Sequence, residues 1–129
     1  MRKLSVSTVK RVQFLDITPD IRRVIREEGS ENKFLLLHVP HTTAGLTINE
    51  NADPDVVKDI INKTGELIPE KDNYTHVEGN SDSHLKSSLV GAQLFVMIEK
   101  GVPVLGRWQA VYFCEFDGPR RRDIYYKII

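Results

Sequence analysis

The sequence predicts an α+β protein, a single domain over residues 1–129 in which a mainly antiparallel or mixed β-sheet sandwich carries two or three helices. Three observations lead to this class. Short runs with strand-like patterns are more frequent than helical patterns, and the few helical patterns are bounded by capping residues. Strands and helices do not alternate as in a doubly wound fold. The sequence also contains no Gly-x-Gly-x-x-Gly or Walker phosphate loop.

The first quarter of the chain is predicted to contain two strands and a helix. Residues 2–9 and 12–17 read as strands, and we expect them to form a β-hairpin around residues 10–11. Thr18 is a good N-cap with a proline after it, and Gly29 is a typical helix end. We therefore expect a helix between these two residues, with one apolar face.

The middle of the chain is predicted to hold two more strands and a second helix. Residues 33–39 are apolar at odd and even positions alike, which is typical of a strand covered on both faces. Leu46 and Ile48 alternate with polar neighbours and indicate the next strand. An Asp-Pro pair ending at Pro54 begins a helix that we expect to reach about Leu67.

The last part of the chain is predicted to be a long loop, a short helix and several strands. The polar segment 69–80 shows neither helical nor strand periodicity, and loops of this length are usually functional or mobile. Ser81 or Asp82 begins a helix that runs to about Val90 and stops at a glycine. The strands expected after it are residues 92–99, 102–116 with a break near Gly106, and 121–129.

Composition argues against several classes of function. The 18 basic and 18 acidic residues give a formal net charge of zero, so no global field would hold nucleic-acid phosphates. The apolar runs are far shorter than the roughly 20 residues that span a bilayer. Cys114 is the single cysteine, which excludes an intrachain disulfide and any cysteine-based zinc site within one chain. We expect a cytoplasmic protein that binds neither nucleic acid nor a membrane.

Three of the four histidines lie in short polar segments, whereas the fourth lies in an apolar run. The spacings of His41, His76 and His84 match no short zinc motif, so only the fold can bring them together. Neutral imidazole is the commonest protein ligand of transition metals, and three imidazoles can leave a coordination position open. Exposed histidines without a role are the alternative. His38, among apolar strand residues, is expected to be a core histidine.

Other segments carry polar groups in unusual settings. Strand alternation places Gln109 and Glu115 on one face with apolar side chains, so both must be paired or line a polar cleft. Residues 120–122 are consecutive arginines, which suit the capture of phosphate or carboxylate. A charged strand edge that discourages pairing is the alternative for these arginines. The polar residues after His41 can line a pocket or form turns.

Three blocks of the sequence, taken together, closely resemble the YjbQ-like uncharacterised protein family. The first block is His-Thr-Thr-Ala-Gly-Leu-Thr-Ile-Asn-Glu-Asn-Ala-Asp-Pro at 41–54. The second joins His76 to Glu-Gly-Asn-Ser-Asp-Ser-His-Leu-Lys at 78–86. The third covers 106–122, from Gly-Arg-Trp-Gln to Glu-Phe-Asp-Gly-Pro-Arg-Arg-Arg. The resemblance runs nearly end to end. It implies a small α+β homotrimer with secondary thiamine-phosphate synthase activity.

The resemblance, together with the clustering of polar residues, suggests roles for individual side chains. His41, His76 and His84 correspond to the motif histidines and are the expected metal ligands, whereas His38 falls outside the motif. The candidate catalytic residues are Glu115, Glu50 and Gln109, with the two glutamates as general acid or base. The residues expected to bind a small phosphorylated substrate are Lys86, Arg120, Arg121, Arg122, Asn49, Asn51 and Thr42.

The expected histidine ligands and the expected reaction favour different metal ions. Thiamine-phosphate synthesis joins a pyrimidine diphosphate to a thiazole phosphate and expels pyrophosphate, a departure that Mg²⁺ on oxygen ligands usually assists. Three imidazoles instead suit Zn²⁺ or another divalent transition metal. Two alternatives therefore stay open. One is a zinc-dependent hydrolase of phosphate or acyl esters, and the other is a non-catalytic ligand-binding trimer.

Overall fold

The computed structural model describes residues 1–28, 31 and 33–129, and it confirms the α+β class. Gly29, the predicted end of the first helix, lies outside the described residues. The elements in chain order are β1 (Arg2–Ser7), β2 (Gln13–Asp16), α1 (Thr18–Glu28), β3 (Lys33–His38), β4 (Ala44–Glu50), α2 (Pro54–Leu67), α3 (Ser81–Val90), β5 (Gln93–Glu99), β6 (Val102–Pro103), β7 (Gln109–Glu115) and β8 (Arg121–Ile128). None of the described helices is long and apolar enough to cross a membrane.

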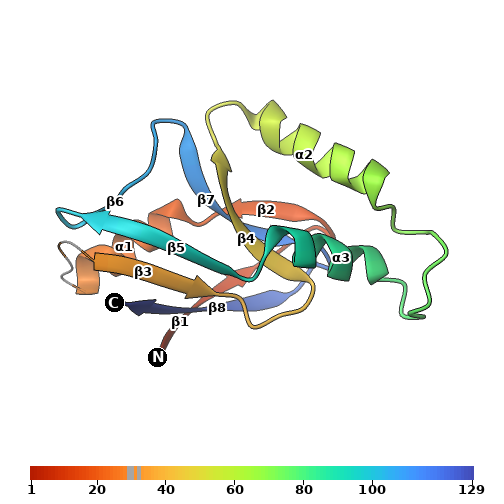
Figure 1. The fold of residues 1–129 in the computed structure, drawn as a ribbon, viewed down its shortest axis with the longest axis horizontal. Helices are drawn as coiled ribbons and strands as arrows, with labels where there is room; N and C mark the ends of the chain where they lie inside the picture. The colour runs from red at the N-terminus through yellow and green to blue at the C-terminus, as the bar shows by residue number, and fades with distance from the viewer. Residues whose placement is uncertain (29–30, 32) are drawn as a thin grey trace.

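The strands form two antiparallel sheets (Figure 1). The five-stranded sheet has the order β1-β8-β3-β5-β6, and the three-stranded sheet has the order β2-β7-β4. The predicted hairpin of the first two strands is wrong, because β1 and β2 belong to different sheets. Leu4 of β1 lies opposite Ile124 of β8, whereas Leu15 of β2 lies opposite Phe113 of β7. The segment between them carries the chain from one sheet to the other.

The main core lies between the two sheets and α1. The five-stranded sheet contributes Leu35 and Leu37 of β3, and the three-stranded sheet contributes Phe113 of β7. Helix α1 adds Ile21 and Ile25, which are fully buried. This explains the apolar face predicted for the helix. Thr18 is the first residue of this helix and not its N-cap, and its hydroxyl accepts the N–H of Val111 in the neighbouring sheet at 2.9 Å.

A second, smaller core covers the other face of the three-stranded sheet. Ala110, Tyr112 and Cys114 of β7 alternate with the main-core residues of the same strand and pack with Phe116. Side chains from α2 and α3 complete this cluster, and Figure 1 shows both helices on this side of the molecule. Cys114 is fully buried, and burial raises the pKa of its thiol far above the ordinary value, so it is a small core residue.

The outer face of the five-stranded sheet stays open in the single chain. Phe34 of β3 is 48% exposed, and Phe95 and Met97 of β5 are 58% and 56% exposed. The expectation that the 33–39 strand is covered on both faces therefore holds for one face only. His38 also lies on this outer face, partly exposed beside Gln93, and not in the core.

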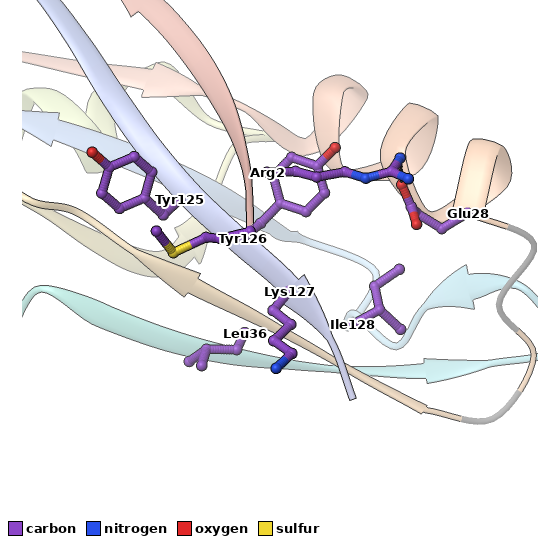
Figure 2. Close-up of a pocket in the computed structure, with 8 residues that line it drawn as sticks. Arg2, Glu28, Leu36, Tyr125, Tyr126, Lys127 and Ile128 are labelled. Atoms are coloured by element: carbon purple, nitrogen blue, oxygen red, sulfur yellow. Dashed lines mark hydrogen bonds and ion pairs between the residues drawn. The ribbon is translucent and has the colours of Figure 1, made fainter.

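A hollow of about 380 Å³ lies along the C-terminal strand β8 (Figure 2). Leu36, Tyr125 and Lys127 line it from the sheet, and the ion pair of Arg2 with Glu28 closes one end. None of the histidines borders it. It also borders Glu28 of α1 and Ile128 of β8, and it is separate from the site described next.

Helix α3 is fixed against β4 by a close backbone approach. The backbone N–H of Leu46 donates to the carbonyl oxygen of Gly91, just after α3, at 3.0 Å. A Cβ atom added at Gly45 would lie 2.6 Å from that same oxygen, so glycine is required there. This approach holds the helix that carries His84 beside the strand that follows His41.

Candidate functional site

The three histidines of the polar segments line one pocket of about 490 Å³. It forms where β4, α3 and β8 all begin, next to the long loop before α3. We call it the histidine pocket, and its lining residues are Pro40, His41, Thr42, Thr43, His76, Glu78, Asn80, His84, Asp117, Arg120 and Arg122. The fold thus brings together side chains that the sequence separates by 35 and 8 positions.

His41 is held in its neutral form by the backbone of β8. The N–H of Asp123 donates to Nε2 of His41 at 2.9 Å, which requires that nitrogen to be unprotonated. Burial and the nearby Arg122 guanidinium lower the pKa of His41 below its ordinary value. The proton of the neutral ring is therefore on Nδ1, and His41 is a hydrogen-bond donor at that atom.

His76 and His84 form a pair of rings in the lining of the same pocket. Their ring centroids are 5.5 Å apart and their planes are perpendicular. His84 lies in the first turn of α3, where its N–H donates to the carbonyl of Asn80. His76 lies in the preceding loop, with Nε2 3.7 Å from a carboxylate oxygen of Glu78. These two imidazoles are the best-placed proton donors or acceptors of the pocket.

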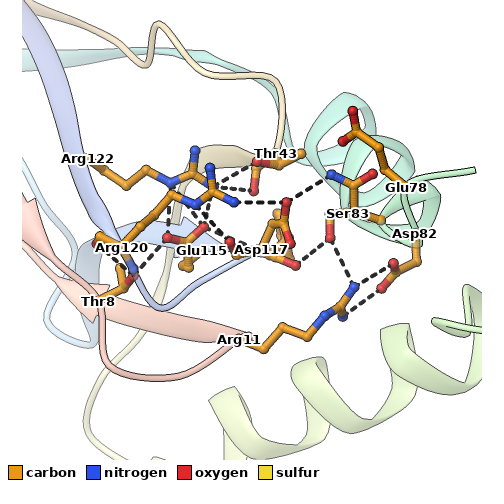
Figure 3. Close-up of polar contacts among 12 residues, drawn as sticks. Thr8, Arg11, Thr43, Glu78, Asp82, Ser83, Glu115, Asp117, Arg120 and Arg122 are labelled. Carbon is orange, nitrogen blue, oxygen red and sulfur yellow. Dashed lines mark hydrogen bonds and ion pairs between the residues drawn. The ribbon is translucent and has the colours of Figure 1, made fainter.

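Glu115 and Arg122 form a buried ion pair beneath the pocket (Figure 3). Glu115 is 0% exposed and Arg122 is 3% exposed. Nε of Arg122 donates to Oε1 of Glu115 at 3.0 Å, the Thr8 hydroxyl donates to the same oxygen at 2.8 Å, and Nη2 of Arg122 donates to the Thr43 hydroxyl at 2.7 Å. Burial opposes ionisation of Glu115, but these donors outweigh it and lower the pKa of the carboxyl.

This network gives Glu115 a different setting from the one expected of a general acid. Its carboxylate is held ionised and does not line the pocket, whereas Arg122 does. Glu115 therefore positions the guanidinium of Arg122. Among the described residues, the hydrogen bonds of that guanidinium come from Nε and Nη2, which leaves Nη1 for a ligand.

Arg120 is the more accessible cation of the pocket. Its side chain is 49% exposed and pairs with Asp117 at 3.1 Å. Asp117 also accepts from the amide of Asn80 at 2.9 Å. The oxygen of that amide is a buried side-chain atom without a hydrogen-bond partner in the described part of the chain. Asn80 thus offers an unused acceptor at the pocket wall.

A second buried ion network anchors the start of α3. Both terminal nitrogens of Arg11 donate to the carboxylate of Asp82, at 2.8 and 3.0 Å, and Lys86 approaches the same carboxylate at 3.1 Å (Figure 3 shows the Arg11–Asp82 fork). Burial opposes ionisation of Asp82, but the two cations outweigh it and lower its pKa. Sequence reasoning missed Arg11 and Asp82 as a pair, although the spacing of Asp82 and Lys86 on one helix face was visible.

The predicted substrate residues divide between the pocket and other places. Thr42, Arg120 and Arg122 line the histidine pocket. Lys86 does not, because it is 6% exposed and bonded to Asp82. Arg121 is exposed on β8 opposite Ser7 and does not line the pocket either.

Four more predicted residues lie at the far end of the three-stranded sheet. They are the candidate catalytic residues Glu50 and Gln109 and the candidate substrate residues Asn49 and Asn51. Glu50 of β4 faces Gln109 of β7, six positions along the strand from the pair of Ala44 with Glu115. This corresponds to roughly 20 Å at the usual rise per residue. Their local contacts are structural: Gln109 accepts the N–H of Gly106, Asn49 accepts the N–H of Glu50, and Asn51 donates to Asp16.

The arrangement of the pocket does not assemble the expected three-histidine metal site. In the described residues, no group of three His, Cys, Asp or Glu side chains is placed to hold a metal ion. His41 is engaged elsewhere, because its unprotonated Nε2 already accepts the N–H of Asp123. A site with all three imidazoles on one ion requires that ring to turn away from β8. The zinc site therefore stays a prediction.

The fold and the pocket define a small α+β protein with a histidine–arginine pocket between its sheets and α3. A family model described as UPF0047 protein YjbQ-like matches residues 2–129. The chain belongs to this YjbQ-like family, which confirms the resemblance drawn from its three sequence blocks.

Relatives by sequence and by structure agree with this assignment. UPF0047 protein MJ1081 of Methanocaldococcus jannaschii is 54% identical over 98% of this chain and 92% of its own length. UPF0047 protein YugU of Bacillus subtilis is 47% identical over 100% and 98%. An uncharacterised conserved YjbQ/UPF0047 protein from Clostridium acetobutylicum superposes with a TM-score of 0.97 at 46% identity, covering all of both chains. A conserved hypothetical protein from Thermus thermophilus gives 0.93 at 40%, also over both whole chains.

Proposed function

We propose that this protein is an enzyme that binds a small phosphorylated molecule in the histidine pocket, with a reaction of the thiamine-phosphate synthase type. The observation that carries the proposal is the joining of three imidazoles with Arg120 and Arg122 in one pocket. Guanidiniums bind phosphate through paired, charge-assisted hydrogen bonds, and imidazoles can move protons beside it.

Arg120 is the expected first contact of a phosphate group. Its partner Asp117 is a single carboxylate in a half-exposed ion pair, and such pairs contribute little to stability. A phosphate carrying two negative charges can compete for the same guanidinium. Nη1 of Arg122 and Nδ1 of His41 add two donors from the pocket floor, both fixed in place by hydrogen bonds at their other nitrogens.

In the proposed reaction, the bond between the pyrimidine methylene carbon and the diphosphate oxygen breaks, and a bond from that carbon to the thiazole nitrogen forms. Pyrophosphate leaves with the bonding electrons. Its growing negative charge needs donors that are already oriented, which lowers the barrier most effectively in a partly buried pocket. His76, His84 and Arg120 supply such donors around one volume. Glu115 acts only by fixing Arg122.

The proposal includes a divalent metal, either Zn²⁺ on the imidazoles or Mg²⁺ with the diphosphate. The zinc site has one structural requirement. Zn²⁺ on all three imidazoles requires His41 to leave Asp123. The hydrolytic alternative would depend on the same rearrangement, because His41, His76 and His84 would have to hold the ion that activates its water. We therefore place it second to the transferase.

The test is the rate of thiamine-phosphate formation from the pyrimidine diphosphate and the thiazole phosphate, with elemental analysis of the same chelator-free preparations. We expect turnover by the wild-type protein and a loss of about a hundredfold in His84→Ala. His38→Ala, which removes a histidine on the outer sheet face, should stay near the wild-type rate. One equivalent of metal that is lost in both His41→Ala and His84→Ala would support the metal part of the proposal.

Other results would point elsewhere. Turnover of simple phosphate or acyl esters that depends on His84, without transferase product, would favour the hydrolase. Saturable binding of phosphates without either turnover would leave a ligand-binding protein. Equal rates in His84→Ala and wild type would contradict an enzymatic role for this pocket, and equal metal content in all variants would contradict the metal site.

We also propose that the protein is a homotrimer, as the family resemblance implies. The exposed aromatic and methionine side chains on the outer sheet face, Phe34, Phe95 and Met97, are the surface that supports it. Two further copies of the chain would cover that surface.

A further inference from the structure

A second pocket of about 380 Å³ adjoins the histidine pocket. It shares His76 and His84 with that pocket, so the two imidazoles form the wall between them. We call it the tyrosine–leucine pocket, and its lining residues are Tyr74, Thr75, His76, Ser81, His84 and Leu85. It opens where the loop before α3 meets the outer side of the helix.

The two pockets differ in chemistry. Arginine, glutamate and aspartate side chains line the histidine pocket, whereas no arginine, lysine, glutamate or aspartate is among the residues that line the tyrosine–leucine pocket. The Tyr74 hydroxyl donates to the carbonyl of Pro69 within the loop, so the phenol is satisfied and its ring is held in place. Leu85 is 46% exposed and presents its side chain to the same pocket.

We propose that the tyrosine–leucine pocket binds the aromatic or heteroaromatic ring of the substrate while the histidine pocket binds its phosphate. This inference rests on the proposed function and defines its substrate class as phosphate or diphosphate esters of a ring-bearing alcohol. Because the two pockets share the side chains of His76 and His84, a ligand whose ring and phosphate are joined by a few bonds can occupy both. The ester linkage then lies against His76 and His84, the residues best placed to move a proton.

The physical driving force is burial of apolar ring surface next to an existing polar anchor. A ring laid against the Tyr74 face and the Leu85 side chain removes apolar area from water on both partners. The imidazole rings of His76 and His84 add stacking surface. A phosphate without a ring gains no free energy from this burial. The tyrosine–leucine pocket therefore discriminates among phosphate esters by the group that is esterified.

Three probes separate the contributions: inorganic phosphate, methyl phosphate and phenyl phosphate, titrated into the full-length protein by calorimetry. We expect phenyl phosphate to bind about tenfold more tightly than methyl phosphate. Leu85→Gln should reduce this ratio to about one while leaving methyl phosphate binding unchanged. Leu89→Gln is the matched control, because Leu89 is 77% exposed on the same helix one turn later and does not line the pocket. It should keep the ratio.

A second measurement locates the ring directly. The methyl signals of Leu85 in a ¹³C-labelled sample should shift with phenyl phosphate and not with methyl phosphate, whereas those of Leu89 should shift with neither. The inference is overturned if the phenyl and methyl esters bind equally, or if Leu85→Gln keeps the wild-type ratio. A second copy of the chain seated on this pocket would give the first of these results. If the protein binds none of the three phosphates, the proposed function fails as well. If it binds the phosphates but does not prefer the phenyl ester, only the ring-binding pocket fails.

Discussion

Glu115 is the residue on which the pocket floor depends most. It is fully buried, accepts hydrogen bonds from Thr8 and Arg122, and holds Arg122 where it borders the pocket. The exchange Glu115→Gln keeps the shape of the side chain but leaves the Arg122 charge buried without a counterion. We expect the free energy of unfolding to fall by about 3 kcal/mol at neutral pH, measured by urea denaturation. Glu50→Gln, at the far end of the sheet, should change it by no more than about 0.5 kcal/mol.

The same pair predicts how stability depends on pH. The pKa of Glu115 is lower in the folded protein than in the unfolded chain, so its contribution is fully present above the unfolded value of about 4.3. It is lost as pH falls below that value towards the folded pKa. Wild-type stability should therefore drop on acidification from about pH 4.3 downward, and Glu115→Gln should show a shallower drop. An equally steep drop in the variant would show that other carboxylates carry the acid sensitivity.

At the scale of an element, α3 owes its position to contacts that lie outside its own sequence. Arg11, from the segment between the two sheets, forms a fork on Asp82 in the first turn. The Ser87 hydroxyl donates to the carbonyl of Ala44 at the start of β4. Helix α3 has few apolar contacts of its own, because its buried residues are mainly serine, aspartate and lysine. The ion network therefore largely decides where His84 stands.

Removing the fork should loosen this one helix selectively. In Arg11→Gln, Asp82 keeps only Lys86 as counterion inside a buried site, which makes local opening of α3 less costly. We expect the amides of residues 84–90 to exchange with solvent about tenfold faster, while those of α1 stay unchanged. Arg107→Gln, which removes an arginine stacked on Trp108 at 4.8 Å, is the control and should leave α3 unaffected. Uniform acceleration in every element would indicate global destabilisation instead.

The elements themselves were largely predictable, because their signals are local. Pro54 after an N-cap aspartate starts α2, and Gly91 ends α3, as the sequence indicates. The pairing of strands was not predictable. The hairpin expected around 10–11 rests on proximity in sequence, but β1 finds its partner more than a hundred positions away in β8. Alternation shows which face of a strand is apolar and gives no information about which strand lies beside it.

The candidate site shows the same limit at the scale of the whole molecule. The polar surroundings of the three histidines indicate a site, and the fold brings them to one pocket. Polar neighbours point to Glu50 and strand alternation points to Gln109, yet strand register places both at the other end of β4 and β7. Lys86 illustrates a further point, since helix periodicity alone does not reveal that its ammonium group turns inward to Asp82. Distance along a strand and burial of a charge are both tertiary properties.

The open sheet face leads to the prediction for the whole molecule. Phe34 pairs with Met97 across the sheet, and Leu36 pairs with Phe95, so these apolar side chains form one continuous surface on β3 and β5. A strand that is apolar at odd and even positions is expected to be covered on both faces. The sequence does not show whether the outer face is covered by the same chain or by a second copy. Within the described chain nothing covers it, since Phe95 remains 58% exposed. Burial of this surface between copies is the driving force that we expect for trimer formation.

A charge placed on that surface should separate the copies without unfolding them. We expect the wild-type protein to sediment at micromolar concentration with a mass near three times that of its 14.8 kDa chain. Phe95→Glu should sediment as a monomer with unchanged circular dichroism, because a carboxylate buried between copies would lack a counterion. Val9→Glu alters a residue that is 71% exposed outside the two strands, and it should remain a trimer. A monomeric wild type, or a trimeric Phe95→Glu, would show that the outer face serves another purpose.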